Sequence, residues 1–552
     1  MKFIGIKILS ILIIIGTQVF FACVPSVKKE NVKYRLIHNN DGTDLLSNTW
    51  FNKRPLSPAD VDSCVDMVAN SQVTTYMICT GSNLFYMRSK YGRILGENFE
   101  GMKLRDSDTT QYNTIHNLYY QNHLRLEKAG TDLIKQSLKR AKAKGLETFI
   151  TYRLNDLHFS DTINNCPATY SQFWIDHPEY WLKDSTQGWN SAGAFNFAIK
   201  EVRDYKLAII YEQLENYADL IDGYDLDFMR FIVYFKSGTG EEYSSLMTQF
   251  VKDVRKKVDE ISLKQGRKIL LSARVPPTVD QCLMKGVDVR EWLQLGLLDF
   301  ITTGIHWTGD PAMAVSQFKE TLGKDLNIPF YSSVDDGGYR KPRVPWSHGM
   351  FRGMCSHILS QGADGIYLFN YYFGELAKNN NQILLEEGGQ VCRTISPTLL
   401  QELGSLETLK GRNKVYALSD GTVEYEIKHN TPLPLKVNKA KQAVANIYVG
   451  DKVEENYPKE SFLFIRTDQS ASFELSVNGH KVDKEKPEYV KLYDQDRELK
   501  EEEYVYAFIL PEQVLLHKDN KFEFTTQEEK GFTVKRLELA LKYGDVKTHG
   551  YF

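Results

Sequence analysis

The sequence predicts an α/β fold, a (β/α)₈ or TIM barrel, followed by a C-terminal all-β sandwich domain of jelly-roll-like type. Three observations predict this organisation. Eight short apolar segments alternate with amphipathic segments between residues 34 and 400, polar side chains follow nearly every apolar segment, and helical periodicity ends after Gly411. Strands that alternate with helices form a parallel sheet, and eight strands close a barrel. The competing open sheet would carry G-x-G-x-x-G after its first strand, where the sequence has none.

The apolar segments have the length and the β-branched or aromatic content of strands. In chain order they are Tyr34–His38, Val73–Cys79, Glu147–Tyr152, Gly223–Phe228, Lys268–Ala273, Asp299–Thr303, Pro329–Ser333 and Gly365–Phe369. The segments between them have helical spacing and are Asp60–Ala69, Leu126–Ala143, Val202–Tyr217, Tyr243–Leu263, Val289–Leu295, Ala314–Leu322 and Gly349–Ser360. Ser57-Pro58 before the first helix and glycines after several others are helix start and stop signals.

The first thirty residues predict an export signal rather than a part of the fold. A short basic stretch precedes an apolar run over residues 8–15, and Ala22 stands directly before Cys23. These features are typical of a secretory signal. The junction resembles a bacterial lipobox, with Phe20 where that motif usually has Leu. We therefore expect a lipoprotein signal peptide over residues 1–23 and a lipid on Cys23.

A lipid on Cys23 would attach the protein to the cell envelope, at the outer membrane, on its periplasmic side or at the cell surface. An ordinary cleaved signal is the alternative, and a retained membrane helix is disfavoured because the apolar run is shorter than the ~20 residues that span a bilayer. The net charge of −3 gives no overall positive field. We therefore expect no nucleic-acid partner. The lipid expected on Cys23 makes the membrane a partner.

The composition is that of a globular protein, with 42% hydrophobic and 25% charged residues. The cysteines after the signal form no C-x-x-C pair and no cluster with histidine, which favours neither a zinc site nor a disulfide framework. They are Cys64, Cys79, Cys166, Cys282, Cys355 and Cys392. We expect neither a metal nor a cofactor.

Polar side chains stand where nearly every predicted strand ends. In a barrel these ends meet at one rim, where catalytic and binding side chains gather. Convergence from so many separate strands is hard to explain by solvation alone. We expect the following rim residues to bind the substrate: His38, Asn40, Arg153, Asn155, Asp156, His158, Arg230, Arg274, His306, Trp307, Asn370 and Tyr371.

The connections after the second and third predicted strands, about residues 81–122 and 155–197, are far longer than usual. The second is rich in aromatic residues, among them Trp174, Trp181 and Trp189. Long aromatic loops at a barrel rim can form a cleft for an extended, ring-shaped ligand. The other interpretation is that these side chains form a small core within the loop. We expect at least one of these tryptophans, or Trp307, to stack on a ligand ring.

Asp225 and Asp227 are two residues apart on the fourth predicted strand, so both face the barrel interior. Two neighbouring carboxylates do not both ionise readily, so one pKa should rise or a cation should neutralise the pair. Arg153, Arg230 and Arg274 are the candidate cations. The pair then has one group that can hold a proton and one that stays anionic, as glycoside hydrolysis requires. The alternative is a salt-bridge network that only stabilises the rim.

The segment Asp222-Gly223-Tyr224-Asp225-Leu226-Asp227-Phe228 resembles the fourth-strand motif of family 18 glycoside hydrolases, D-G-x-D-x-D-x-E. It departs from that motif at Met229, where the family has its acid Glu. Residues 34–400 are also similar to bacterial glycosyl hydrolase-like lipoproteins of the family-10-like group. The motifs D-x-D-F-M-R and R-L-N-D-L-H carry that likeness. Retaining α-glycosidase barrels, which are similar as well, end their fourth strand with a nucleophilic Asp, which corresponds to Asp227.

These features predict a glycoside hydrolase whose carbohydrate substrate is a complex oligo- or polysaccharide. Asp227 is the predicted nucleophile or main anionic stabiliser, Asp225 tunes and orients it, and Asp336 in the acidic turn after the seventh strand is the predicted proton donor. One alternative is a non-catalytic glycan-binding lipoprotein, which Met229 favours. Another is a barrel polysaccharide lyase or deacetylase. The sugar, the linkage, retention or inversion and the oligomeric state are left open.

Residues 411–552 predict the β domain, after a barrel over residues 34–400. Short strands separated by turn signals are typical of a sandwich or jelly roll. They are Val423–Ile427, Ser461–Ile465, Phe473–Val477, Tyr504–Ile509, Lys521–Phe524 and Val534–Tyr543. Asn478-Gly479 predicts a hairpin turn. The domain resembles accessory domains of carbohydrate-active barrels, and either sugar binding or a structural role fits it.

Overall fold

The structure is a computed structural model in which Tyr34–Phe552 form one compact unit. It describes residues 34–552 except 44, 47–54, 98–109, 159, 161–169, 307–308, 324, 327, 336–338, 341–342, 345–347, 372–383, 386–390, 393–396, 420, 422, 484–503 and 545–552. The predicted signal peptide and Cys23 lie outside the described residues. Among the residues described, no helix is both long and apolar enough to cross a membrane.

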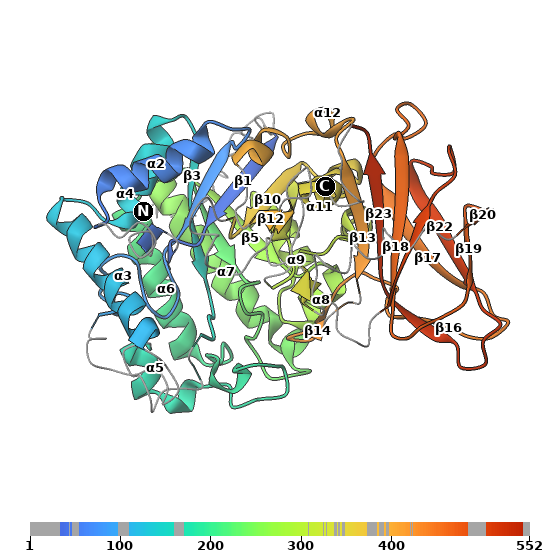
Figure 1. Ribbon diagram of the computed structural model, residues 1–552. Helices are drawn as coiled ribbons and strands as arrows, with labels where there is room; N and C mark the ends of the chain where they lie inside the picture. The colour runs from blue at the N-terminus through green and yellow to red at the C-terminus, as the bar shows by residue number, and fades with distance from the viewer. Residues whose placement is uncertain are drawn as a thin grey trace, which may run out of the picture. The chain divides into compact units, whose positions relative to one another are not determined.

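Eight parallel strands close into a barrel in the order β1-β10-β7-β6-β5-β4-β3-β2 (Figure 1). This confirms the predicted barrel, and each strand overlaps its predicted segment. The strands are β1 Arg35–Asn40, β2 Thr75–Cys79, β3 Glu147–Arg153, β4 Gly223–Asp227, β5 Leu270–Val275, β6 Phe300–Thr303, β7 Phe330–Asp335 and β10 Gly365–Phe369. Their residues are almost entirely buried, as expected for strands between a packed interior and a helical shell.

The barrel interior contains a cluster of packed aromatic and aliphatic side chains. They are Ile37, Met77, Phe149, Phe300, Tyr331, Tyr367 and Phe369. Gly223 is required at the start of β4, because a Cβ there would lie 2.1 Å from the ring of Phe149. This packed layer supports the polar side chains nearer the carboxyl ends of the strands.

Helices connect the strands. They are α2 Pro58–Ala69, α3 Thr110–Lys128, α4 Leu133–Ala143, α6 Lys200–Asn216, α7 Gly240–Gln265, α8 Val279–Met284, α9 Val289–Gln294, α10 Val315–Leu322 and α11 His348–Ser360. The single helix predicted over Leu126–Ala143 is wrong. The chain breaks at Gly130, whose φ is +80°, and Asp132 caps α4 by accepting a hydrogen bond from the Lys135 amide at 2.8 Å.

Antiparallel sheets follow the barrel, coloured orange to red in Figure 1, and confirm the predicted all-β sandwich region. One sheet has the order β13-β23-β18-β21, with β16 paired to β23, and the other has the order β17-β22-β19-β20. Their strands are β13 Lys414–Ser419, β16 Leu435–Val437, β17 Ala443–Val449, β18 Glu460–Thr467, β19 Glu474–Val477, β20 His480–Val482, β21 Tyr504–Ile509, β22 Lys518–Thr525 and β23 Phe532–Lys542. Asn478-Gly479 forms the predicted turn between β19 and β20, with both residues at positive φ.

The strand predicted over Val423–Ile427 is wrong. The segment is a hairpin of two short strands, β14 Val423–Glu424 and β15 Ile427–Lys428, paired only with each other. Its turn residues Tyr425 and Glu426 have φ of 51° and 68°. The alternating sequence V-E-Y-E-I predicts an extended strand, but the left-handed backbone at these two residues reverses the chain.

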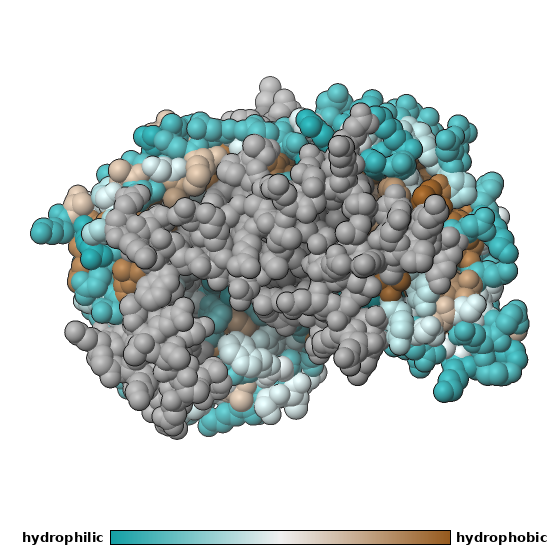
Figure 2. Space-filling model, in the orientation of Figure 1, coloured by the Kyte–Doolittle hydropathy of each residue, from teal (hydrophilic) through white to brown (hydrophobic). Residues whose placement is uncertain are grey.

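The C-terminal sheets pack on the barrel helix α11. Gly353 lies so close to β13 that a Cβ would stand 2.0 Å from the carbonyl oxygen of Val415. The buried hydroxyl of Tyr416 donates to Asp451 and lies 2.9 Å from the Ser356 hydroxyl. The described residues visible around the C-terminal sheets in Figure 2 are mostly hydrophilic, with small hydrophobic areas between them.

Candidate functional site

The register of the barrel places polar side chains in two rows across β3, β4 and β5. Thr151, Asp225 and Ser272 are paired in one row, and Arg153, Asp227 and Arg274 in the next row toward the carboxyl ends. Residues two apart on a strand face the same side, so both rows face the barrel interior.

Asp225, in the lower row, is fully buried and surrounded by hydroxyl groups. It accepts hydrogen bonds from Thr151 Oγ1 at 2.9 Å and Ser272 Oγ at 2.6 Å. Burial, together with the charge of Asp227, raises the pKa of the Asp225 carboxyl to about 6, although the hydrogen bonds from Ser272 and Thr151 oppose that rise. One carboxyl of the pair can therefore hold a proton near neutral pH, which is one of the two outcomes that the sequence left open.

Asp227, in the upper row, has a cation and a backbone donor. Arg274 Nη1 lies 3.1 Å from Asp227 Oδ1, and the backbone N–H of Met229 donates to the same oxygen at 2.9 Å. Both hydrogen bonds stabilise the carboxylate form. Arg274 is itself fixed, because it donates to the carbonyl of Ile305 at 2.6 Å and its guanidinium lies 3.8 Å from the centre of the Phe369 ring.

Arg153, on the other side of Asp227, is held by groups from the first and last barrel strands. It forms an ion pair with Asp41 and donates to Asn370 Oδ1 at 3.1 Å. Burial would raise the pKa of the Asp41 carboxyl, but the charges of Arg153 and Arg230 outweigh it and hold that pKa below its usual value. Arg153 therefore joins β1, β3 and β10 in one polar network.

A second ionic group follows β3 at the rim. His158 Nδ1 contacts Asp156, and the other ring nitrogen of His158 lies 3.3 Å from Arg230 Nη2. Burial would raise the pKa of Asp156, but His158, Arg230 and Arg153 lower it well below its ordinary value. His158 is 42% exposed, so this group reaches the surface of the site.

Three other residues predicted to bind the substrate lie on or next to the first and last strands and are buried: His38, Asn40 and Tyr371. His38 Nε2 is 3.0 Å from the carbonyl oxygen of Tyr371, and the His38 ring stacks on Tyr76. Burial lowers the pKa of His38 to about 4, so the imidazole is neutral at neutral pH. Asn40 accepts a hydrogen bond from the Gly42 amide at 2.7 Å. Their predicted role in substrate binding stays a prediction.

Asn155 connects two loops of the rim. Its amide donates to the carbonyls of Phe195 and Val233 and accepts from the Phe195 amide, at 2.5–3.1 Å. The side chain is 1% exposed, so its hydrogen-bonding groups serve the loops that frame the site.

The aromatic loop after β3 divides into a packed part and an exposed part. Trp174 stacks between Tyr170 and Trp181, with ring centroids at 4.4 and 4.1 Å, and is 1% exposed. These residues form the small loop core that was one of the two interpretations. Trp189 is different, because it is 49% exposed and its ring lies 6.1 Å from both His158 and Phe231.

The hairpin β14–β15 brings a carboxylate to the rim that the sequence analysis missed. Glu424 Oε2 lies 3.2 Å from Nδ1 of His306, after β6, and both side chains are buried. The ring of Tyr425 packs against Phe231 and His306, at centroid distances of 5.6 and 5.0 Å. No local signal could have placed Glu424 here, because its partners are more than a hundred residues away in the chain.

The remaining carboxylates after β6 and β7 are placed as follows. Asp336 and Trp307 lie outside the described residues, and Asp335 ends β7 as a buried residue. Asp310 accepts hydrogen bonds from the backbone amides of Ala312 and Asn430, both at 2.9 Å, which makes it a loop support. Within the described part of the chain, no group of three or more His, Cys, Asp or Glu residues could hold a metal ion.

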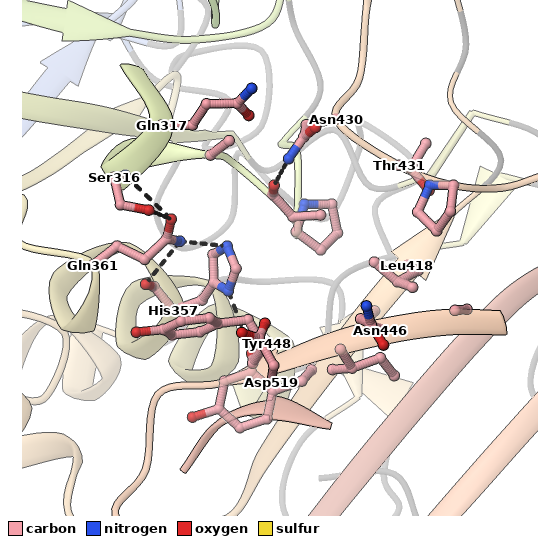
Figure 3. Close-up of a pocket in the computed structure, with 18 of the residues that line it drawn as sticks. Ser316, Gln317, His357, Gln361, Leu418, Asn430, Thr431, Asn446, Tyr448 and Asp519 are labelled. Carbon is pink, nitrogen blue, oxygen red and sulfur yellow. Dashed lines mark hydrogen bonds between the residues drawn. The ribbon is translucent and has the colours of Figure 1, made fainter. Parts of the chain in front are cut away.

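A hollow of about 570 Å³ lies between α10, α11 and the strands β13 and β17 (Figure 3). Its polar side chains bond mainly to one another and to backbone. His357 Nε2 is 3.0 Å from the Met313 carbonyl and 2.7 Å from Gln361, which also bonds to Ser316. This arrangement joins the barrel helices to the sheets, and we assign it no chemistry.

Comparison with known proteins gives no matching family model and no matching curated protein. Solved structures similar to the chain include α-L-fucosidase isoenzyme 2 from Paenibacillus thiaminolyticus, with a TM-score of 0.38 and 11% identity over 67% of this chain and 48% of the fucosidase. The chain thus spans about half of that enzyme. The catalytic domain of GH30 xylanase C from Talaromyces cellulolyticus has a TM-score of 0.33 and 11% identity, covering 90% of this chain and 98% of the xylanase domain. BuGH86, solved with neoagarooctaose, has a TM-score of 0.31 and 11% identity, covering 92% and 95%.

Proposed function

We propose that the protein is a glycoside hydrolase that cleaves glycosidic bonds in a complex oligo- or polysaccharide. The observation that carries the proposal is the pair of carboxyls on β4, in which Asp227 is fixed by Arg274 above a protonatable Asp225. The pair stands at the carboxyl end of a closed barrel, where barrel enzymes have their active sites.

In this mechanism Asp227 attacks the anomeric carbon or stabilises the positive charge that develops on the sugar ring. The Met229 amide and Arg274 hold one of its oxygens in place, so little reorganisation is needed during the reaction. Asp225 lies deeper on the same face and tunes the charge of Asp227. The sequence predicted Asp336 as the proton donor, and this residue lies outside the described residues. A distance of ~5–5.5 Å between the two catalytic carboxyls would give retention, and ~6.5–9.5 Å inversion.

Substrate contacts are proposed for the exposed side of the rim, where His158, Arg230 and Trp189 lie close together. An exposed aromatic ring beside charged hydrogen-bond donors suits the apolar face and the hydroxyl groups of a sugar. This geometry supports the proposal that these three residues bind the substrate.

A non-catalytic glycan-binding protein is the second candidate, because Met229 stands where family 18 enzymes have their acid. The Met229 side chain is fully buried, so this position contributes only its backbone N–H to the site. A proton donor must then come from another strand or loop.

A screen for released reducing sugar against a glycan library, with and without EDTA, tests the proposal. A glycoside hydrolase of this kind releases sugar equally in both conditions. Release that EDTA abolishes would indicate a metal-dependent enzyme. Binding without any release would favour the glycan-binding candidate and contradict the hydrolase.

We also propose a lipid anchor on Cys23 that holds the protein in the cell envelope. Its support is the Ala22-Cys23 junction after a short apolar run. Cys23→Ala should move the protein from the membrane fraction to the soluble fraction in its native host. Unchanged fractionation would contradict the anchor.

A further inference from the structure

We propose that Glu424, on the β14–β15 hairpin, is a proton-donating carboxyl of the barrel site, so that the C-terminal region contributes a catalytic group. The inference deepens the proposed glycoside hydrolase and rests on it. It assigns the role of proton donor, which the sequence predicted for Asp336, to a residue that the structure describes.

The hairpin is anchored to the barrel on both sides of its turn. Glu426 forms an ion pair with Lys285 Nζ at 2.5 Å, and the Lys428 backbone exchanges two hydrogen bonds with the Gln281 side chain. The Tyr425 hydroxyl donates to the carbonyl of Trp189 at 3.2 Å. These contacts fix the hairpin against α8 and the aromatic loop, so Glu424 has a defined position.

The turn carries side chains that a turn of this type does not favour. Residues at two consecutive positive φ angles are most often Asn or Gly, because a larger side chain costs of order 1 kcal/mol or more there. Tyr425 and Glu426 occupy both positions, and both side chains contact the barrel rim. The hairpin is therefore held in a strained form by its contacts with the site.

Glu424 lies on the same side of the rim as Asp227. Its partner His306 offers a backbone carbonyl 3.3 Å from Arg274 Nη2, and Arg274 Nη1 holds Asp227. The His306 ring is 4.5 Å from Phe231, in the loop that directly follows β4. The two carboxylates thus approach the site from different elements, as a nucleophile and a proton donor must.

Four other described rim carboxylates suit this role less well. Asp225 is sealed in the lower row by Thr151 and Ser272, and Asp310 supports a loop. Arg153 and Arg230 favour the charged form of Asp41, and His158, Arg230 and Arg153 favour the charged form of Asp156. Glu424 contacts the imidazole of His306, a group that can exchange a proton with it.

The proposed step is a proton transfer from the Glu424 carboxyl to the glycosidic oxygen. The bond from the anomeric carbon to that oxygen breaks, and its electron pair stays on the departing hydroxyl. Asp227 balances the charge on the sugar. A water molecule then adds to the anomeric carbon, and its proton returns to Glu424.

The test compares Glu424→Gln with Glu426→Gln, a matched change on the same hairpin, and with Asp227→Asn. Each is assayed on an oligosaccharide that the wild type cleaves and on the 4-nitrophenyl glycoside of the same sugar. Loss of a general acid should lower kcat/KM for the oligosaccharide by ~10²–10⁴-fold. The loss should be far smaller for the aryl glycoside, because 4-nitrophenolate leaves without a proton. The alkaline limb of the pH profile should disappear in Glu424→Gln and persist in Glu426→Gln and in Glu424→Asp.

Normal activity of Glu424→Gln alongside an inactive Asp227→Asn would overturn this inference and leave the hydrolase standing. Equal losses on both substrates in Glu424→Gln and Glu426→Gln, with the alkaline limb retained, would show a docking role only and also overturn it. A wild type that cleaves no glycan would remove the proposed function itself. Thermal unfolding of each variant separates chemistry from folding, and Glu424→Asp keeps the test valid if the Gln variant unfolds.

Discussion

Asp225 and Asp227 stand two residues apart on one strand and face the same interior, yet their surroundings are opposite. The partners of Asp225 are the hydroxyls of Thr151, Ser272 and Tyr367, and burial raises its pKa to about 6. The upper row gives Asp227 a guanidinium and a backbone N–H. A difference of one layer in the barrel thus gives two neighbouring carboxyls different electrostatic surroundings.

Removing Arg274, one of the two cations of the upper row, should produce the largest change in stability. Arg274→Met leaves the Asp227 carboxylate buried without its guanidinium, which should lower the free energy of unfolding by ~3–5 kcal/mol. Arg267→Met is the control, because Arg267 pairs with Asp222 where both side chains are about one third exposed. That variant should lose less than ~1 kcal/mol. Equal losses in urea unfolding would contradict the special role of the upper row.

Removing the Asp225 carboxyl should remove a pH dependence of the free energy of unfolding. The folded pKa of Asp225, about 6, lies above the ordinary value of 3.8, so the stability contribution is fully present below pH ~4 and is lost as the pH rises through 6. The difference between these two pKa values corresponds to ~3 kcal/mol in the free energy of unfolding. Asp225→Asn should therefore gain stability relative to the wild type between pH 4 and pH 7.

Urea unfolding of both proteins at several pH values measures this difference. A constant gap between the wild type and Asp225→Asn across that pH range would show that Asp225 is not the group that titrates.

Removing the exposed aromatic ring at the rim should have the smallest effect. Trp189→Ala should weaken the binding of a cleaved oligosaccharide by roughly 5–10-fold, which corresponds to ~1 kcal/mol for one aromatic contact. Tyr504→Ala, at a similarly exposed ring on the C-terminal sheet, should leave the affinity unchanged. Titration calorimetry checks both, and an unchanged affinity in Trp189→Ala would place the sugar elsewhere on the rim.

The barrel could be predicted because its strands are continuous apolar runs and its rim residues follow them directly. The β4 pair could be predicted for the same reason, since strand alternation alone sets Asp225 and Asp227 on one face. The sequence left open whether one pKa of the pair rises or a cation neutralises it. The hydroxyls around Asp225 come from neighbouring strands, and the sequence does not state the register of those strands.

The hairpin and the α3–α4 break could not be predicted, for different physical reasons. Tyr425 and Glu426 lack the turn chemistry that marks a hairpin, and contacts with Lys285 and His306 hold them in the left-handed region. Apolar spacing continues across Gly130, so periodicity alone joins two helices into one. Strand β17 was missed because its alternation of buried and half-exposed residues includes short and polar side chains.

The most direct measurement of the central claim is the turnover of Asp227→Asn on an oligosaccharide that the wild type cleaves. The amide keeps the shape of the carboxylate and loses its charge. The proposed role of Asp227 predicts a fall in kcat of ~10³-fold or more, corresponding to ~4 kcal/mol of lost transition-state stabilisation, with the folded structure retained. A folded Asp227→Asn variant that turns over at the wild-type rate would contradict it.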